Sequence, residues 1–395
     1  MPRANLPISG PAVILAITAV GTTGSVPDAA PLITSVSGSV TQGGTLTISG
    51  SGFGTKSPAQ PYLWAPMSND LNPSSLGVIK SWARIGALNY QPGCGPAPNT
   101  GCAAGAPSDG MNTNQWAAAI YSPSYYGSGN DWNSYGQKSY VYRKSKRTFS
   151  YSNNGSTNVK MFRMWGTSPT QFLVYPDFYW SVYNGRIGIE GIPQNGTHDY
   201  TMPSTTINTA MGPVNQWYSE EYALASNTGA ATSDGDFRIA INGGTDLVSF
   251  PNNQWERNSI TLKVDSGSQG DGTMKVLYPV HMIVESGGNW IPAPTGSQYF
   301  AADVYADTTW ARVMIGNSPL FNQTTDREIQ IPVQWSSGSI QVNVNINAFP
   351  AGQQMYLFVV DSNGNVSPGL PISAGTASGG PTATVPDAPS NVTVK

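Results

Sequence analysis

The sequence predicts an all-β protein, and three observations support that prediction. Only 10% of the residues are charged, against roughly 25% in ordinary soluble domains, so few segments can oppose a charged face to an apolar stripe as amphipathic helices do. The 44 glycines and 31 prolines divide the chain into short segments. Within these segments apolar and polar residues alternate with period two, as in half-buried strands. A length of 395 residues predicts two or three domains.

The first segment, residues 1–30, is predicted to be an N-terminal arm. Residues 11–20 form an apolar run that is too short to span a bilayer, so no membrane span is expected. The run follows Arg3 and precedes an Asp-Ala-Ala sequence at 28–30, and it therefore resembles the core of a signal peptide. We interpret it instead as a β-strand or an assembly arm.

The next segment carries a strand–turn–strand pattern. Residues 32–36 and 45–49 read as strands, with a Gly-Gly turn at 43–44 between them. A Gly-Ser-Gly-Phe-Gly sequence at 50–54 then predicts a tight corner anchored by Phe53. In order and spacing, this stretch resembles the opening of IPT/TIG immunoglobulin-like domains.

The remaining strands that this resemblance implies appear only near the end of the chain. The corresponding strands are 311–316, 328–332, 339–345, 354–360 and 366–372, with a hairpin turn signal at 361–364. We therefore predict one Ig-like β-sandwich in two pieces, 31–56 and 308–374. An insertion of this length is tolerated where the ends of the insert lie close together.

The insert, residues 57–307, is predicted to be a second β-sandwich. Its strand signals include 159–165, 172–175, 236–241, 259–264 and 297–305. A Trp-led strand at 215–222, followed by Asp-Gly, a strand and Asn-Gly at 234–243, resembles the concanavalin-A-like lectin/glucanase jelly roll. That resemblance implies a fold and leaves the activity open.

The last segment, residues 375–395, is a Gly/Ser/Pro-rich tail. Its residues 385–394 resemble the first strand of a fibronectin type III domain. Tails of this composition are ordered only where something holds them. We expect neighbouring copies in an assembly to do so here.

The two cysteines, Cys94 and Cys102, lie in one Gly/Pro-rich loop. We expect a disulfide between them, because such a loop has no other means of holding a single conformation. Two cysteines cannot form a structural zinc site alone, and His198 and His281 are distant in the sequence. Loop aspartates at 131, 234 and 236 could hold Ca²⁺, but their spacing matches no recognised calcium loop, so our expectation is that no metal or cofactor is bound.

The charge pattern argues against a nucleic-acid partner. The net charge is −3 and the isoelectric point is about 5.4, so no basic stripe neutralises phosphates. The densest basic run consists of Arg143, Lys144, Lys146 and Arg147. It is either an anion or acidic-sugar contact or, as we favour, the solvated polar edge of a strand.

No spacing selects a catalytic site. Glu220 and Glu221 are adjacent, so on a strand they face opposite sides and cannot act on one bond. Asp177, Glu190 and Glu285 are further carboxylates without a diagnostic spacing. Polysaccharide lyases of the jelly-roll family use Arg-x-Glu, Gln-x-His and Tyr-x-Lys-x-Gly signatures that are not reproduced here, which leaves Arg163 and His198 as unsupported candidates. His281 reads as a histidine of an apolar strand.

Non-catalytic sugar binding requires aromatic surfaces edged by hydrogen-bonding groups. Aromatic residues in Gly/Ser/Asn-rich segments are hard to bury, which makes them the better candidates for stacking on pyranose rings. The glycan-binding candidates are Tyr125, Tyr126, Trp132, Tyr135, Trp180 and Tyr183.

These observations favour a non-enzymatic structural protein on the surface of a particle, such as a virion decoration or fibre protein. Its expected partners are copies of itself, other particle proteins and a cell-surface glycan, at a virion-surface or extracellular location. A secreted polysaccharide lyase or glycoside hydrolase is the first alternative, and a bacterial surface adhesin is the second.

Overall fold

The computed structural model describes residues 30–66, 138–149, 212–225, 297–346, 349–350 and 352–377 with their side chains, as well as 238, 240 and 241. For the remaining strands it describes the backbone. All of these elements are strands except one 3-10 turn, η2, at Phe321–Gln323. The all-β prediction is confirmed. Among the described residues no helix is long and apolar enough to cross a membrane.

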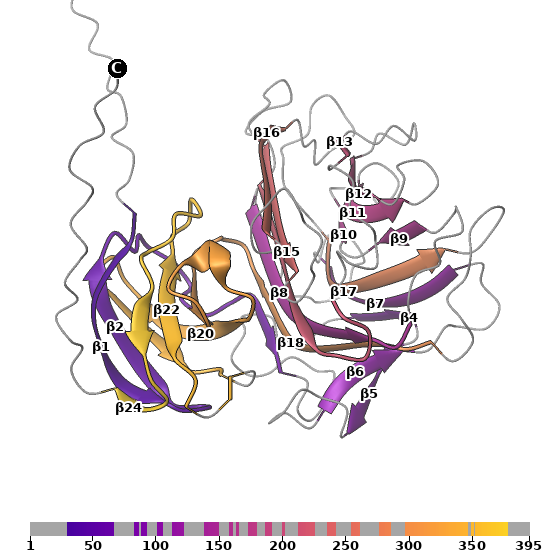
Figure 1. Ribbon diagram of the computed structural model, residues 1–395. Helices are drawn as coiled ribbons and strands as arrows, with labels where there is room; N and C mark the ends of the chain where they lie inside the picture. Colours follow the sequence, from indigo (N-terminus) through magenta and orange to yellow (C-terminus); the bar gives the residue numbers. More distant parts are fainter. Residues whose placement is uncertain are drawn as a thin grey trace, which may run out of the picture.

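The first β-sandwich, here called the split sandwich, combines strands from both ends of the described chain (Figure 1). Its strand order is β23-β22-β19-β20-β21-β2-β1-β24. The strands are β1 Leu32–Val40, β2 Thr45–Ser51, β19 Arg312–Gly316, β20 Arg327–Trp335, β21 Ser339–Asn343, β22 Met355–Val360, β23 Leu370–Ile372 and β24 Gly375–Ala377.

Strand β20 belongs to both layers of the split sandwich. Its first half pairs with β19, from Arg327 to Gln330, and its second half pairs with β21, from Ile331 to Trp335. A register shift between Pro332 and Gln334 accompanies the change of partner. Strands that switch sheets in this way form the corners of sandwiches.

The predicted pairing between the two ends of the chain is confirmed. Strand β2 pairs antiparallel with β21, from Thr45 opposite Asn343 to Ser49 opposite Ser339. Leu46 and Ile48 of β2 share one apolar core with Ile340 and Val342 of β21. The division of the chain into domains at residues 56 and 308 stays an interpretation.

The glycine-rich corner at 50–54 has the predicted aromatic anchor. Phe53 is fully buried in the core of the split sandwich. Its backbone oxygen accepts a hydrogen bond of 3.2 Å from the indole nitrogen of Trp335. Gly52 and Gly54 have positive φ angles of 71° and 67°, which is the left-handed conformation that glycine adopts without strain.

The second sandwich, here called the inserted sandwich, contains two sheets. The inner sheet has the order β16-β15-β14-β8-β18-β6-β5, with β3 paired to β18. Its strands are β3 Leu63–Ala65, β5 Leu88–Pro92, β6 Gly101–Gly105, β8 Lys138–Arg147, β14 Tyr218–Ala225, β15 Gly235–Ile241, β16 Gln254–Ile260 and β18 Tyr299–Asp307.

The outer sheet has the order β13-β12-β11-β10-β17-β7-β4, with β9 paired to both β11 and β17. Its strands are β4 Ala83–Gly86, β7 Thr113–Tyr121, β9 Asn158–Lys160, β10 Arg163–Trp165, β11 Leu173–Tyr179, β12 Arg186–Gly191, β13 Tyr200–Thr201 and β17 Val276–Glu285. The outer sheet lies on the side of the inner sheet that faces away from the split sandwich (Figure 1). Within the strand predicted over 159–165, the described residues form β9 and β10.

The inner sheet packs against the split sandwich through a second apolar core, here called the junction. Tyr140, Tyr142 and Tyr305 of the inner sheet meet Met314 and Phe358 of the split sandwich there. The connections between the two sandwiches also lie together, because Lys56 and Asp307 form an ion pair of 2.6 Å. The expectation that the ends of the insert lie close together is met.

The prediction that the basic run is a solvated strand edge is wrong. The run lies on β8, which is flanked by β14 and β18 inside the inner sheet. Arg143 and Arg147 are fully buried and Lys144 is 3% exposed. Each of these buried cations has partners: Arg143 pairs with Glu220 of β14, and Lys144 pairs with Glu328 of β20. Arg147 donates to the backbone oxygens of Phe149, two residues along the chain, and of Gly212.

Candidate functional site

The adjacent glutamates of β14 face opposite sides of the inner sheet, as predicted. Glu220 points into the inserted sandwich, where it pairs with Arg143 and accepts a hydrogen bond of 3.1 Å from the Tyr222 hydroxyl. Glu221 points into the junction, where it accepts hydrogen bonds from the Tyr140 hydroxyl at 2.9 Å and from Arg327 Nε at 2.7 Å. Since a glycosidase needs two carboxyls beside one bond, these two glutamates do not form its acid–base pair.

Around Glu221 the junction is an ion-pair cluster. Arg327 and Arg312 both approach its carboxylate, the latter at 3.6 Å, and all three side chains are at least nine-tenths buried. The Arg312 guanidinium also lies over the Tyr140 ring, 4.3 Å from its centroid. Glu221 is therefore a buried counter-ion that joins the two sandwiches.

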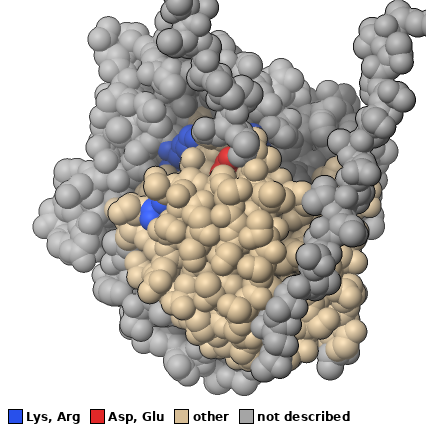
Figure 2. Space-filling model, turned by 90° about the vertical axis from the view of Figure 1, so that its left-hand side faces the viewer, with Lys and Arg blue, Asp and Glu red and all other residues tan. Residues whose placement is uncertain are grey.

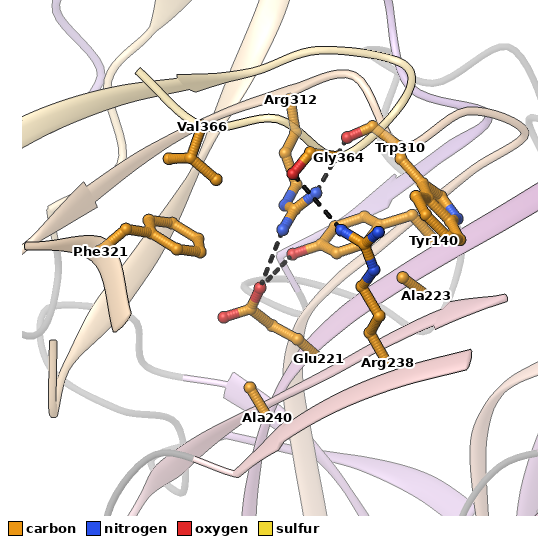
Figure 3. Close-up of a pocket in the computed structure, with 10 residues that line it drawn as sticks. All are labelled: Tyr140, Glu221, Ala223, Arg238, Ala240, Trp310, Arg312, Phe321, Gly364 and Val366. Atoms are coloured by element: carbon orange, nitrogen blue, oxygen red, sulfur yellow. Dashed lines mark hydrogen bonds and ion pairs between the residues drawn. The ribbon is translucent and has the colours of Figure 1, made fainter. Parts of the chain in front are cut away.

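A small cavity adjoins this cluster (Figure 3). Glu221, Tyr140 and Arg312 form one side, and Phe321 and Val366 lie across from them. At the rim, Arg238 donates to the backbone oxygen of Gly364 at 3.4 Å. The volume of about 30 Å³ holds one or two water molecules. A sugar ring does not fit, so this cavity is not a glycan site.

A second buried pair, Lys144 and Glu328, lies in the same junction. The Tyr142 hydroxyl donates to Glu328 Oε2 at 2.9 Å. Burial raises the pKa of Glu328 from 4.5 to about 7; Lys144 counteracts this rise and the charges of Asp303 and Asp326 add to it. The junction therefore contains a carboxyl group that titrates near neutral pH.

The strand register of the outer sheet brings chemically interesting positions together on one face. Asp177 of β11 lies opposite Lys160 of β9, and Tyr175 lies opposite Glu190 of β12. Arg163 of β10 belongs to the same face, because Trp165 lies opposite Leu173 and alternate residues share a face. We call these positions the polar face: Lys160, Arg163, Trp165, Tyr175, Asp177, Tyr179, Arg186, Glu190, His281 and Glu285.

The opposite face of the outer sheet carries a different pattern. Met164, Val174, Phe178, Ile187, Ile189, Met282 and Val284 occupy it by the same register. In an antiparallel sheet with one face packed on a core, the apolar positions are the buried ones. From the sequence pattern alone, we expect the apolar positions to face a core and the polar face to be the less apolar side, although Leu173, Val276 and Ile283 share the polar face.

Two carboxylate positions on the polar face are close neighbours. Asp177 lies opposite Gly188, two residues from Glu190, so the two acidic positions are diagonal across β11 and β12. Diagonal positions on neighbouring strands lie roughly 7–8 Å apart. Sequence spacing alone did not pair them. The alternation of Tyr175, Asp177 and Tyr179 was the local signal that could have indicated the face.

Several predicted site residues lie outside the described residues. Arg163 has a described backbone only, in β10, and Cys102 likewise in β6, where it is opposite Gln91. The positions outside the described residues are Cys94, Tyr125, Tyr126, Trp132, Tyr135, Trp180, Tyr183 and His198. The predicted disulfide and the predicted aromatic sugar contacts therefore stay predictions.

Potential metal ligands were sought in the same described ranges. There, no three His, Cys, Asp or Glu side chains are grouped as metal ligands. Of the calcium candidates, Asp131 and Asp234 lie outside these ranges, and only the backbone of Asp236 is described.

No protein-family model matches the chain, and no curated protein matches its sequence. Among solved structures, the alginate lyase vAL-1 from Chlorella virus is similar with a TM-score of 0.32 and 10% identity, over 57% of this chain and 90% of the lyase. The endo-1,3-beta-glucanase from Streptomyces sioyaensis has a TM-score of 0.32 and 11% identity, over 64% and 98%. Lectin II from Ulex europaeus has a TM-score of 0.31 and 10% identity, over 58% and 94%. Likenesses this remote assign no activity to the chain.

Proposed function

We propose that the polar face of the outer sheet binds a carbohydrate chain and that the protein holds this glycan without cleaving it. The observation that supports the proposal is the register that gathers aromatic positions 165, 175 and 179 with charged positions on one face. Aromatic rings present flat apolar surfaces to sugar rings, and neighbouring charged groups supply hydrogen bonds.

An exposed sheet face suits a polymer better than a small free sugar. Small ligands are held in concave pockets that bury most of their surface. An extended chain can instead bind several weak positions along a sheet, and repeated copies of the protein multiply the effect. The cavity that adjoins the charged cluster of the junction is water-sized, and we therefore take the sheet face as the better candidate.

We further propose that the protein is displayed on a particle or in the extracellular space, with copies of itself or other particle proteins as partners. Low charge supports this setting. In the described parts of the split sandwich, Arg312, Arg327, Glu328 and Asp361 are all buried and Asp326 is half-buried. Figure 2 shows the resulting broad uncharged surface, with charged residues only at its margin.

A carbohydrate-active enzyme is the second candidate. It is favoured by the diagonal positions of Asp177 and Glu190, with Arg163 on the same face. Catalysis would require an acid and a base within hydrogen-bonding reach of the same bond. A lyase would additionally require a cation beside the sugar carboxylate, which position 163 could supply.

One experiment separates these candidates. The full-length protein is incubated with a panel of neutral and acidic polysaccharides while retention in affinity gels, new reducing ends and the ultraviolet absorbance of unsaturated sugars are followed. Retention without products supports the proposal. Products that disappear in Asp177→Asn or Glu190→Gln establish the enzyme instead, and a complete lack of retention and products refutes both.

A further inference from the structure

Three buried side chains, those of Lys56, Tyr305 and Asp307, contact one another where the two sandwiches are connected. Lys56 Nζ lies 2.6 Å from Asp307 Oδ2, and the two side chains are only 2% and 5% exposed. Lys56 Nζ also donates to the Tyr305 hydroxyl oxygen at 3.1 Å, and that hydroxyl donates to Asp307 Oδ2 at 2.8 Å. The Thr308 backbone N–H donates to the other carboxyl oxygen, Oδ1, at 2.8 Å.

The surroundings favour the uncharged forms of both partners. Burial lowers the pKa of Lys56, although the charge of Asp307 partly counteracts this. Burial raises the pKa of Asp307, although Lys56 and hydrogen bonds partly counteract that. A desolvated neutral lysine is a competent nucleophile, whereas an ammonium is not.

We propose that Lys56 and Asp307 condense to an intramolecular amide that covalently joins the two connections. The Nζ lone pair attacks Asp307 Cγ, and the C–Oδ2 bond breaks as the amide forms. Asp307 reacts as the neutral acid, with its own proton on Oδ2. Nζ passes one proton to the Tyr305 oxygen, Tyr305 passes its own proton to Oδ2, and Oδ2 departs with these two hydrogens as one water molecule. No oxidant, cofactor or second substrate is consumed.

Tyr305 and the Thr308 backbone N–H each contribute to the formation of the amide. Tyr305 contacts both the attacking nitrogen and the departing oxygen, which is the arrangement a proton relay requires. The Thr308 N–H supports the negative charge that develops on Oδ1. Since the reacting groups are held in contact, the effective concentration reaches roughly 10⁵–10⁸ M, as in other well-oriented intramolecular reactions.

The Lys144–Glu328 pair shows why burial alone is insufficient. It too is a buried lysine–carboxylate contact. The pKa of Lys144, however, is raised: burial lowers it, but the carboxylates of Glu328, Asp326 and Asp303 together outweigh burial. Lys144 therefore stays an ammonium, and it serves as the matched control.

The amide would close residues 57–306 into a covalent loop at its base. A pulling force applied to the split sandwich would then pass through the new bond and bypass the inserted sandwich. Such a link suits a protein displayed on a surface, but its existence does not depend on the proposed function.

Intact mass spectrometry of the denatured full-length protein tests the proposal. The expected mass is one water below that of the sequence, and trypsin is expected to leave a branched peptide linked from Lys56 to Asp307. The branched peptide distinguishes the amide from a succinimide at an Asp-Gly sequence, which has the same mass loss. A full mass, or separate unmodified peptides containing Lys56 and Asp307, would overturn the proposal.

Three variants assign the roles, each compared with the mass of its own sequence. Lys56→Met is expected to lose the mass deficit completely, and Tyr305→Phe to form the bond more slowly, so that freshly purified protein is a mixture. Lys144→Met is expected to retain the deficit. A deficit that persists in Lys56→Met, or that disappears in Lys144→Met, would contradict the assignment.

Discussion

At the scale of single residues, the junction depends on carboxylates that are buried with their counter-ions. Glu221 is held by Arg327, Arg312 and the Tyr140 hydroxyl. Breaking a buried ion pair by removing one partner leaves a desolvated charge without compensation. The stability of the junction is therefore sensitive to single charge-removing substitutions.

The first prediction concerns this cluster. Glu221→Leu is expected to lower the free energy of unfolding by about 3–5 kcal/mol, because Arg327 and Arg312 then lack their carboxylate. The double variant Glu221→Leu/Arg327→Met is expected to recover part of that loss, since one of the uncompensated charges is removed as well. Urea denaturation followed by tryptophan fluorescence measures both. A double variant less stable than the single variant would count against the ion-pair account.

The second prediction concerns pH. The pKa of Glu328 is raised from 4.5 to about 7, chiefly by burial, so the folded protein retains a proton that the unfolded chain releases. The stabilising contribution is complete below pH 4.5 and is lost as the pH rises through about 7. Glu328→Gln is expected to flatten this part of the stability profile. The measurement is the urea midpoint at about pH 5 and about pH 8, and an unchanged slope in the variant would refute the assignment.

The two glutamates of β14 show what local sequence could and could not predict. Their opposite orientation was predictable, because the two-residue period of a strand is a local property. The burial of Arg143 and Lys144 was not, because their counter-ions Glu220 and Glu328 are 77 and 184 residues away along the chain. Only the fold brings these charges together.

At the scale of elements, β1 approaches the start of the corner at 50–54 so closely that residue 50 must be a glycine. A Cβ atom on Gly50 would lie 1.9 Å from the backbone oxygen of Leu32 and 2.5 Å from Cζ of the buried Phe53. A Cβ atom on Gly43, where φ is +74°, would have no other atom within 4 Å. The two glycines are therefore required for different reasons.

The third prediction follows from this contrast. Gly50→Ala is expected to destabilise the protein by about 3 kcal/mol or more, because backbone atoms must move. Gly43→Ala is expected to cost about 1 kcal/mol, since only the left-handed conformation is penalised. Thermal unfolding of the two variants compares them directly. Equal losses would show that β1 and the corner can separate without cost.

Strand pairing was predictable where two distant segments each held only part of the strands of one Ig-like sandwich. The alternating residues 45–49 and 339–345 belong to these two parts, and they pair as β2 and β21. The polar face was missed, because it depends on the register of five strands rather than on any one segment.

At the scale of the whole molecule, the inner and outer sheets of the inserted sandwich have different neighbours. One face of the inner sheet joins the split sandwich at the junction, and the outer sheet lies on the far side (Figure 1). On our proposal, the polar face of the outer sheet binds the glycan, and the junction joins the inserted sandwich to the split sandwich. Rigid elements position binding groups better than loops do.

The most direct test of the carbohydrate-binding proposal compares face variants with a remote control. The dissociation constant of a retained polysaccharide is measured by calorimetry for the wild-type protein, Arg163→Ala, Tyr175→Ala and Leu320→Ala, the last at an exposed position of the split sandwich. We predict at least about tenfold weaker binding for the two face variants and no change for Leu320→Ala. Equal affinity in all four proteins would contradict the proposal that the polar face of the outer sheet binds the glycan.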